Sequence, residues 1–120
     1  MTQDELFFSA LQGLVGGRVY PDIGKEGTAV PYITYQDIGG EAVNFVDGAA
    51  PSKANARVQV NVWAATRAQA KSIARQVENA LRAVPALQTL VIGAPATTYD
   101  PEAKYYGTIQ DFSVWTDVSP

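Results

Sequence analysis

The clearest hydrophobic pattern in this chain is the alternation of residues 57–63, which read Arg-Val-Gln-Val-Asn-Val-Trp. Successive side chains of a β-strand point to opposite faces of a sheet, so Val58, Val60 and Val62 share one face. The polar residues and Trp63 share the other. The pattern predicts a strand whose valine face belongs to the core.

The C-terminal residues 105–115 alternate in the same way and predict a second long strand. Phe112 and Val114 fall on one face, and Asp111 and Trp115 fall on the other. The first face also holds Tyr106, Thr108 and Gln110, and the second also holds Ile109 and Ser113. This strand, like residues 57–63, therefore offers a core side and a more polar side.

The N-terminal residues predict a helix. Thr2 precedes Glu5 by three residues, which is the reciprocal capping pattern that satisfies free N–H groups at a helix start. Apolar residues then recur three or four positions apart, at Leu6, Phe7, Ala10, Leu11 and Leu14. We expect this helix to end at Gly16 and Gly17, because glycine adopts the positive φ that commonly closes a helix.

A second helix is predicted directly after the valine strand. Thr66 and Gln69 repeat the capping pattern, and Pro85 stops the apolar stripe that follows. The stripe consists of Ala68, Ala70, Ile73, Ala74, Val77, Ala80, Leu81 and Val84. We expect the helix to span residues 67–83.

Weaker strand signals lie on either side of these elements. Residues 30–36 are rich in β-branched and aromatic side chains, and Pro31 marks the start of a strand or a free edge because proline cannot donate to a ladder. Residues 89–92 predict a short strand, bounded by Gly93 and Pro95.

Turn-forming residues predict the remaining connections. Residues 18–29 are expected to form a loop, and residues 99–102 a turn. The segment 39–56 is rich in glycine and alanine and predicts a long loop or a flexible hairpin tip. The resulting order, helix, strand, strand, helix, strand, strand, predicts one α+β domain over residues 1–120, with both helices on one face of a mainly antiparallel sheet.

The composition removes most familiar catalytic plans. The chain has no cysteine and no histidine, so thiolate chemistry, disulfides and the commonest general base and metal ligand are absent. Asp100 and Glu102 are a carboxylate pair near Lys104, but a solvated turn explains them better than acid–base catalysis. We expect no enzyme activity, no cofactor and no metal.

The charge distribution bears on the partners. The chain carries 9 basic and 12 acidic residues, for a net charge of −3, and we find no run of cations and no basic helix. We therefore expect no nucleic-acid binding. No apolar stretch approaches the roughly 20 residues that span a bilayer, and the acidic N-terminus is unlike a signal peptide, so we expect no membrane association and synthesis in a cytoplasm.

Several residues are candidates for protein contacts. Trp63 and Trp115 lie on the more polar face of the predicted sheet, where each is either covered by its own loops or serves as an anchor for another subunit. Arg57 and Asp111 share that face and could pair across strands or across subunits. Phe45 and Val46 form the apolar pair of the 39–56 segment, and we expect this segment to order only on assembly.

In combination, these segments resemble the phage tail completion family, which includes tail-to-head joining proteins of long non-contractile tails. The resemblance covers about residues 19–115. It rests on Val-Tyr-Pro at 19–21, on residues 30–36, on the valine strand with Ala64, and on the run from Tyr106 through Asp-Phe-Ser-Val-Trp at 111–115. Each piece is weak alone, but four in this order are fairly specific.

The resemblance implies an α+β fold and a hexameric ring that ends growth of the tail tube. It also implies that the ring docks on the head–tail connector, so the expected partners are further copies of the chain, the tube protein and the connector, within the virion. Another neck or minor tail protein and a small-molecule binding module are the alternatives.

Overall fold

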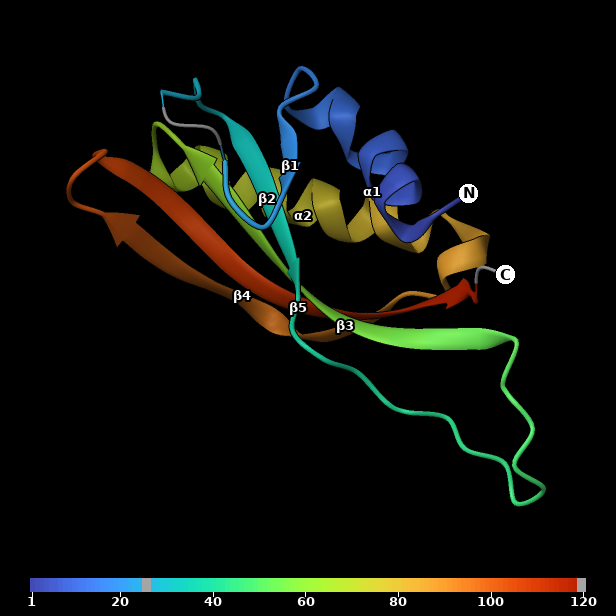
Figure 1. The fold of residues 1–120 in the computed structure, drawn as a ribbon. Coiled ribbons are helices and arrows are strands. Elements are labelled where there is room, and N and C mark those ends of the chain that lie inside the picture. The colour runs from blue at the N-terminus through green and yellow to red at the C-terminus, as the bar shows by residue number, and fades with distance from the viewer. Residues whose placement is uncertain (25–26, 119–120) are drawn as a thin grey trace.

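The computed structural model describes residues 1–24 and 27–118 of the chain. It contains a five-stranded sheet in the order β1-β2-β3-β5-β4, with both α-helices on one face (Figure 1). The elements are α1 (Gln3–Leu11), β1 (Val19–Pro21), β2 (Tyr32–Asp37), β3 (Lys53–Ala64), α2 (Arg67–Arg82), β4 (Leu90–Asp100) and β5 (Tyr105–Asp117). Short 3-10 turns follow α1 at Gln12–Leu14 and α2 at Pro85–Leu87. The predicted α+β class is confirmed.

Both predicted helix starts are confirmed. The Thr2 hydroxyl accepts the Glu5 N–H at 3.2 Å, and a Glu5 carboxylate oxygen accepts the Thr2 N–H at 3.1 Å. The bond from the Thr2 N–H to the carboxylate, followed by the Thr2 side chain, holds the pKa of Glu5 below its usual value. The Thr66 hydroxyl accepts the Gln69 N–H at 3.1 Å, and α2 ends one residue before the predicted boundary.

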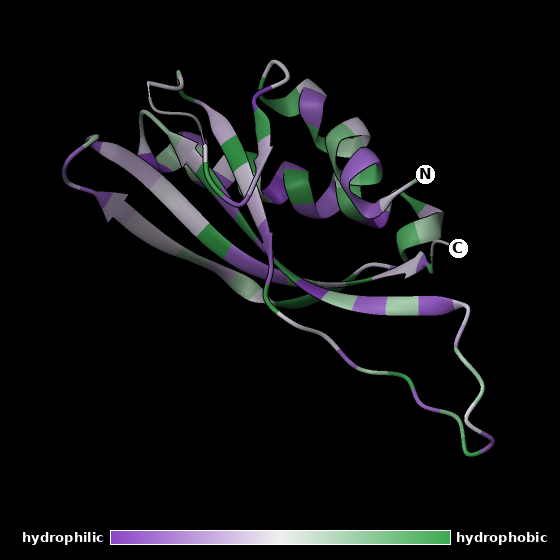
Figure 2. Cartoon of the chain, viewed as in Figure 1, coloured by the Kyte–Doolittle hydropathy of each residue, from purple (hydrophilic) through white to green (hydrophobic). Residues whose placement is uncertain are grey.

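The predicted face assignment of the two long strands is also confirmed. Val58, Val60 and Val62 of β3 are buried against α2, as are Phe112 and Val114 of β5. The helices supply the other half of this core, through Phe7, Leu11, Ala70, Ile73, Ala74, Val77 and Leu81. Figure 2 shows the alternation of polar and apolar residues where the N-terminal end of β3 is exposed.

Two predictions for the edges of the sheet were wrong. Residues 18–29 are not all loop, because Val19–Pro21 form β1, which pairs in parallel with β2. Three residues carry too little periodicity to reveal a strand whose partner lies elsewhere in the sequence. The fourth strand does not end at Ile92 but continues to Asp100, so Tyr99 and Asp100 pair with β5 and the turn predicted over 99–102 lies at 101–104.

A register shift between Ile92 and Ala96 lets β4 continue past Gly93 and Pro95. Proline is tolerated there because β4 is an edge strand, whose outer side needs no donor. The buried Gln110 side chain of β5 donates to the Gly93 carbonyl at 3.1 Å, which satisfies a backbone group that the shift would otherwise leave unpaired.

The segment predicted as a loop over 39–56 is shorter than expected. Lys53 to Ala56 belong to β3 and pair with Val114 to Asp117 of β5, which itself ends two residues later than predicted. We call the remaining residues 38–52 the arm. The arm extends away from the sheet and the helices (Figure 1). The subunit as a whole, with its arm, measures 52 × 25 × 24 Å.

Candidate assembly interface

The face of the sheet opposite the helices is open in the part of the chain that is described. From β3 it presents Arg57, Gln59, Asn61 and Trp63, and from β5 it presents Ile109, Asp111, Ser113 and Trp115. Most of these side chains are half-buried by their neighbours, and no described helix covers them. We refer to this surface as the open face.

Arg57 and Asp111 pair across strands within one subunit. The Nη2 and Nε atoms of Arg57 donate to Oδ2 of Asp111 at 2.7 and 3.0 Å. The guanidinium is about half exposed, so the pair contributes only about 0–1 kcal/mol to stability. Its main effect is to fix the position of both side chains on the open face.

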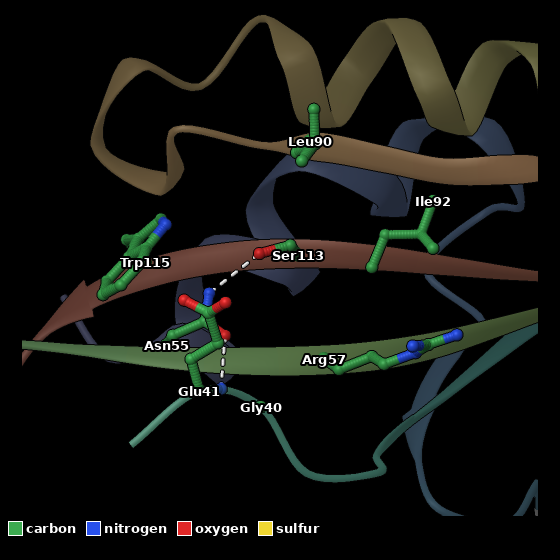
Figure 3. A pocket seen from close by; sticks show the side chains of 8 residues that line it. All are labelled: Gly40, Glu41, Asn55, Arg57, Leu90, Ile92, Ser113 and Trp115. Atoms are coloured by element: carbon green, nitrogen blue, oxygen red, sulfur yellow. Dashed lines mark hydrogen bonds between the residues drawn. The ribbon is translucent and has the colours of Figure 1, made fainter. Parts of the chain in front are cut away.

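A groove of about 500 Å³ lies beside this ion pair, at the root of the arm. Its lining consists of Gly40, Glu41, Asn55, Arg57, Leu90, Ile92, Ser113 and Trp115 (Figure 3). Leu90 is 65% exposed, although it is a large apolar residue. The groove therefore combines an apolar side, formed by β4 and Trp115, with a polar side formed by β3 and the arm.

Asn55 joins the arm to the sheet. Its side-chain oxygen accepts the Glu41 N–H at 2.8 Å, and its side-chain nitrogen donates to the Ser113 hydroxyl at 2.8 Å (Figure 3). The same nitrogen also donates to the Val114 carbonyl at 3.1 Å. The Arg57 N–H also donates to the Gly39 carbonyl at 2.8 Å. These bonds hold the arm root in place, so the groove is formed in the free subunit.

The tip of the arm is a turn with exposed apolar residues. The Gly48 N–H donates to the Phe45 carbonyl at 3.0 Å, and the Ala49 N–H donates to the Asp47 carboxylate at 2.9 Å. Phe45 is 52% exposed and Val46 is fully exposed. The structure thus separates these two predicted site residues from the other four by the length of the arm.

Trp63 and Trp115 share the open face, as predicted, but lie at opposite ends of it. Trp115 is level with Asn55 and Trp63 with Gly107 in the β3–β5 register, which places them about 25–27 Å apart along the strands. Trp63 packs on Gly107, where any Cβ would lie 2.7 Å from the indole ring. The six predicted residues therefore lie at three separate places on the subunit and do not form one patch.

One feature of the helices contradicts the sequence analysis, which found no basic helix. The residues Arg67, Lys71, Arg75 and Arg82 all lie on α2 and are all exposed. They were missed because they are spaced by four and seven residues and do not form a run. The spacing itself was the available signal, since residues four apart share a helix face.

Asp100 and Glu102, the carboxylate pair noted in the sequence, lie at the β4–β5 turn. Asp100 Oδ1 accepts the N–H groups of Glu102 and Ala103 at 3.0 and 3.3 Å, so its carboxylate closes the β4–β5 turn. Within residues 1–24 and 27–118, no group of three or more acidic side chains is arranged to hold a metal ion. No helix in these ranges is long and apolar enough to cross a bilayer.

The comparison with protein families decides the broader identity. The family model described as tail completion protein gp17 matches residues 8–117, which is nearly the whole chain. The chain belongs to the tail completion family. It is therefore a phage tail structural protein, and the resemblance seen in the sequence is confirmed.

A solved structure described as the virion of a native gene transfer agent particle contains a similar chain. The two are 21% identical, with a TM-score of 0.57, and the match covers 90% of this chain and 84% of the other. At this identity the likeness supports the fold. No curated protein matches the chain.

Proposed function

We propose that this tail completion family member caps the head-proximal end of the tail tube and joins it to the head–tail connector as a hexameric ring. The family match over residues 8–117 carries this proposal. The chain acts as one domain over residues 1–120, is made in the cytoplasm of the bacterial host, and resides in the neck of the virion. Its partners are further copies of itself, the tube protein and the connector.

The surface of the subunit supports an assembly role. Phe45 and Val46 expose apolar area at the end of a long arm, and Leu90 does so beside the groove. The arm buries little area of its own to offset an ordering cost of roughly 1–2 kcal/mol per residue. In this proposal the arm tip anchors on a neighbouring subunit or on the tube, and ordering accompanies binding.

The remaining predicted residues take roles in the same assembly. Trp115 offers an indole to a partner that enters the groove, and Trp63 does so at the far end of the open face. The Arg57–Asp111 pair orients the contact. The proposed role is not enzymatic, because the described site holds no activated nucleophile with a positioned base.

Electron microscopy of phage particles made without this protein tests the capping role. We expect overlong tails or tails without heads, which the wild-type gene restores and the double substitution Phe45→Ala with Val46→Ala does not. Phe8→Ala is the matched control, because Phe8 is 43% exposed but lies on α1. Tails of normal length attached to heads would contradict the proposal.

Native mass spectrometry of the purified chain separates this role from the small-molecule alternative. Rings, or oligomers whose population rises with protein concentration, support assembly. A strict monomer that carries a bound metabolite would instead show that the groove is a ligand site.

A further inference from the structure

The four cations of α2 lie together on one flank of the helix. At 100° per residue, Arg67, Lys71, Arg75 and Arg82 fall within an arc of about 80°. The half-buried Glu78 lies in the same arc, so four cations stand against one carboxylate and leave a net charge of +3. We call these four residues the cationic flank.

The cationic flank faces the β4 edge of the sheet. One surface recess is lined by Lys71, Ser72, Arg75 and Glu78 together with Pro95 of β4. A second recess brings Arg67 beside Thr97, Thr98 and Tyr99 of the same strand. The ion pairs formed by described residues involve Lys53 and Arg57, so no cation of the flank forms an ion pair within the described chain, although Glu78 lies nearby.

Carboxylates gather at the other edge of the sheet. Asp4 of α1, Asp22 after β1 and Asp37 at the end of β2 line one recess with Tyr35. Among the described residues, the side-chain donors to two of these carboxylates are neutral: Tyr35 donates to Asp4 at 2.9 Å, and Gln3 donates to Asp37 at 2.8 Å. Burial and this bond to Asp4 raise the pKa of Tyr35, so it remains a protonated donor. We call the three aspartates the acidic edge.

The two charged surfaces lie on opposite sides of one subunit. β1 and β4 are the outer strands of the five-stranded sheet, four strand spacings or about 19 Å apart. Figure 1 shows α1 and β1 at the top of the view and β4 at the lower left. Complementary surfaces on opposite sides of a subunit produce head-to-tail contacts, which form a ring when the rotation closes.

We infer that the cationic flank of one subunit binds the acidic edge of the next, and that this contact sets the order of subunits around the ring. The inference rests on the proposed ring. It names a second copy of the chain as the partner because the chain itself carries the complementary charge. Outside α2 the chain has 5 basic and 11 acidic residues, so an approaching polyanion such as DNA is repelled.

Charge reversal on each surface tests the inference by sedimentation velocity. Lys71→Glu with Arg75→Glu makes the cationic flank acidic, so that both surfaces are then acidic. Asp22→Lys with Asp37→Lys makes the acidic edge basic, so that both surfaces are then basic. We expect each variant alone to need at least about tenfold more protein than the wild type to assemble, because like charges then meet at every contact. A mixture of the two variants should assemble like the wild type, since acidic and basic edges alternate around the ring.

Added salt should weaken wild-type assembly, because it screens exposed charges. Lys104→Glu is the control for altered net charge, because Lys104 lies in the β4–β5 turn, and it should assemble normally. The substituted side chains are exposed, so circular dichroism should show unchanged folding in every variant.

The outcomes separate the inference from the proposed function. A wild-type chain that stays monomeric at all concentrations and on tail tubes overturns both. Wild-type rings that persist in both reversed variants overturn only the charged contact. A Lys71→Glu and Arg75→Glu variant that assembles normally but loses binding to a labelled DNA duplex also overturns it, in favour of nucleic acid.

Discussion

The helix-covered face of the sheet and the arm both carry apolar residues, but only those of the sheet are buried within the subunit. Val60 is 2% exposed beneath α2, whereas Val46, the same residue type, is fully exposed at the arm tip. Burial of Val60 stabilises the free subunit, while Val46 contributes no comparable burial until something covers it. The comparison separates residues that fold the subunit from residues left for a partner.

The largest effect is expected when the same charge is introduced in both regions. Val60→Asp buries an unpaired carboxylate, which costs several kcal/mol and rivals the roughly 5–15 kcal/mol stability of a typical domain. Val46→Asp leaves the new carboxylate in water. Circular dichroism and thermal melting should show an unfolded first variant and a native second one. A native Val60→Asp would mean that the two faces of β3 are assigned the wrong way round.

Two leucines test the same comparison with a smaller expected loss of stability. Leu81 of α2 is completely buried, so Leu81→Ala should cost about 2–5 kcal/mol through the cavity it leaves. Leu90→Ala removes an exposed side chain and should change the free energy of unfolding by about 0.5 kcal/mol or less. Urea denaturation measures both. Equal losses would show that Leu90 is part of the core.

Two glycines test whether the arm root is fixed to the sheet. A Cβ on Gly40 would lie 2.5 Å from the Asn55 carbonyl oxygen, whereas a Cβ on Gly39 meets nothing within 4 Å, and both residues have positive φ. Gly40→Ala should therefore destabilise the arm root by about 1–3 kcal/mol, and Gly39→Ala by less. Amide exchange at Arg57, whose N–H donates to Gly39, reports the difference. Equal exchange rates in the two variants would contradict a fixed root.

The smallest expected effect is a change in amide exchange within the arm between the free and the assembled subunit. Amides 42–46 should exchange rapidly in the free subunit and slow down in assembled tails, while amides 54 and 56 should be slow in both because they point to β5, with which β3 pairs there. This narrows the mobile segment expected from the sequence, which extended to residue 56. Slow exchange across 42–46 in the monomer would show that the arm is ordered without a partner.

The elements predicted well are those whose signal is local. The valine alternation and the two capping threonines act through residues two to four positions away, so β5, α2 and the starts of both helices were predicted close to their observed limits. Two limits were wrong: α1 ends at Leu11 and not at Gly16 and Gly17, and β3 begins four residues before the predicted strand. The family resemblance rested mainly on these same segments and was confirmed. The candidate contact residues on β3 and β5 were assigned to the correct face for the same reason.

Only the tertiary structure decided features that depend on distant partners. The three residues of β1 are a strand because β2 lies beside them, and β4 passes Gly93 and Pro95 because it is an edge strand with Gln110 beneath the shift. Strand register separated Trp63 from Trp115, and the sheet order placed the α2 cations opposite the aspartates. Local periodicity determines which way a side chain points, whereas the pairing of distant segments determines what it faces.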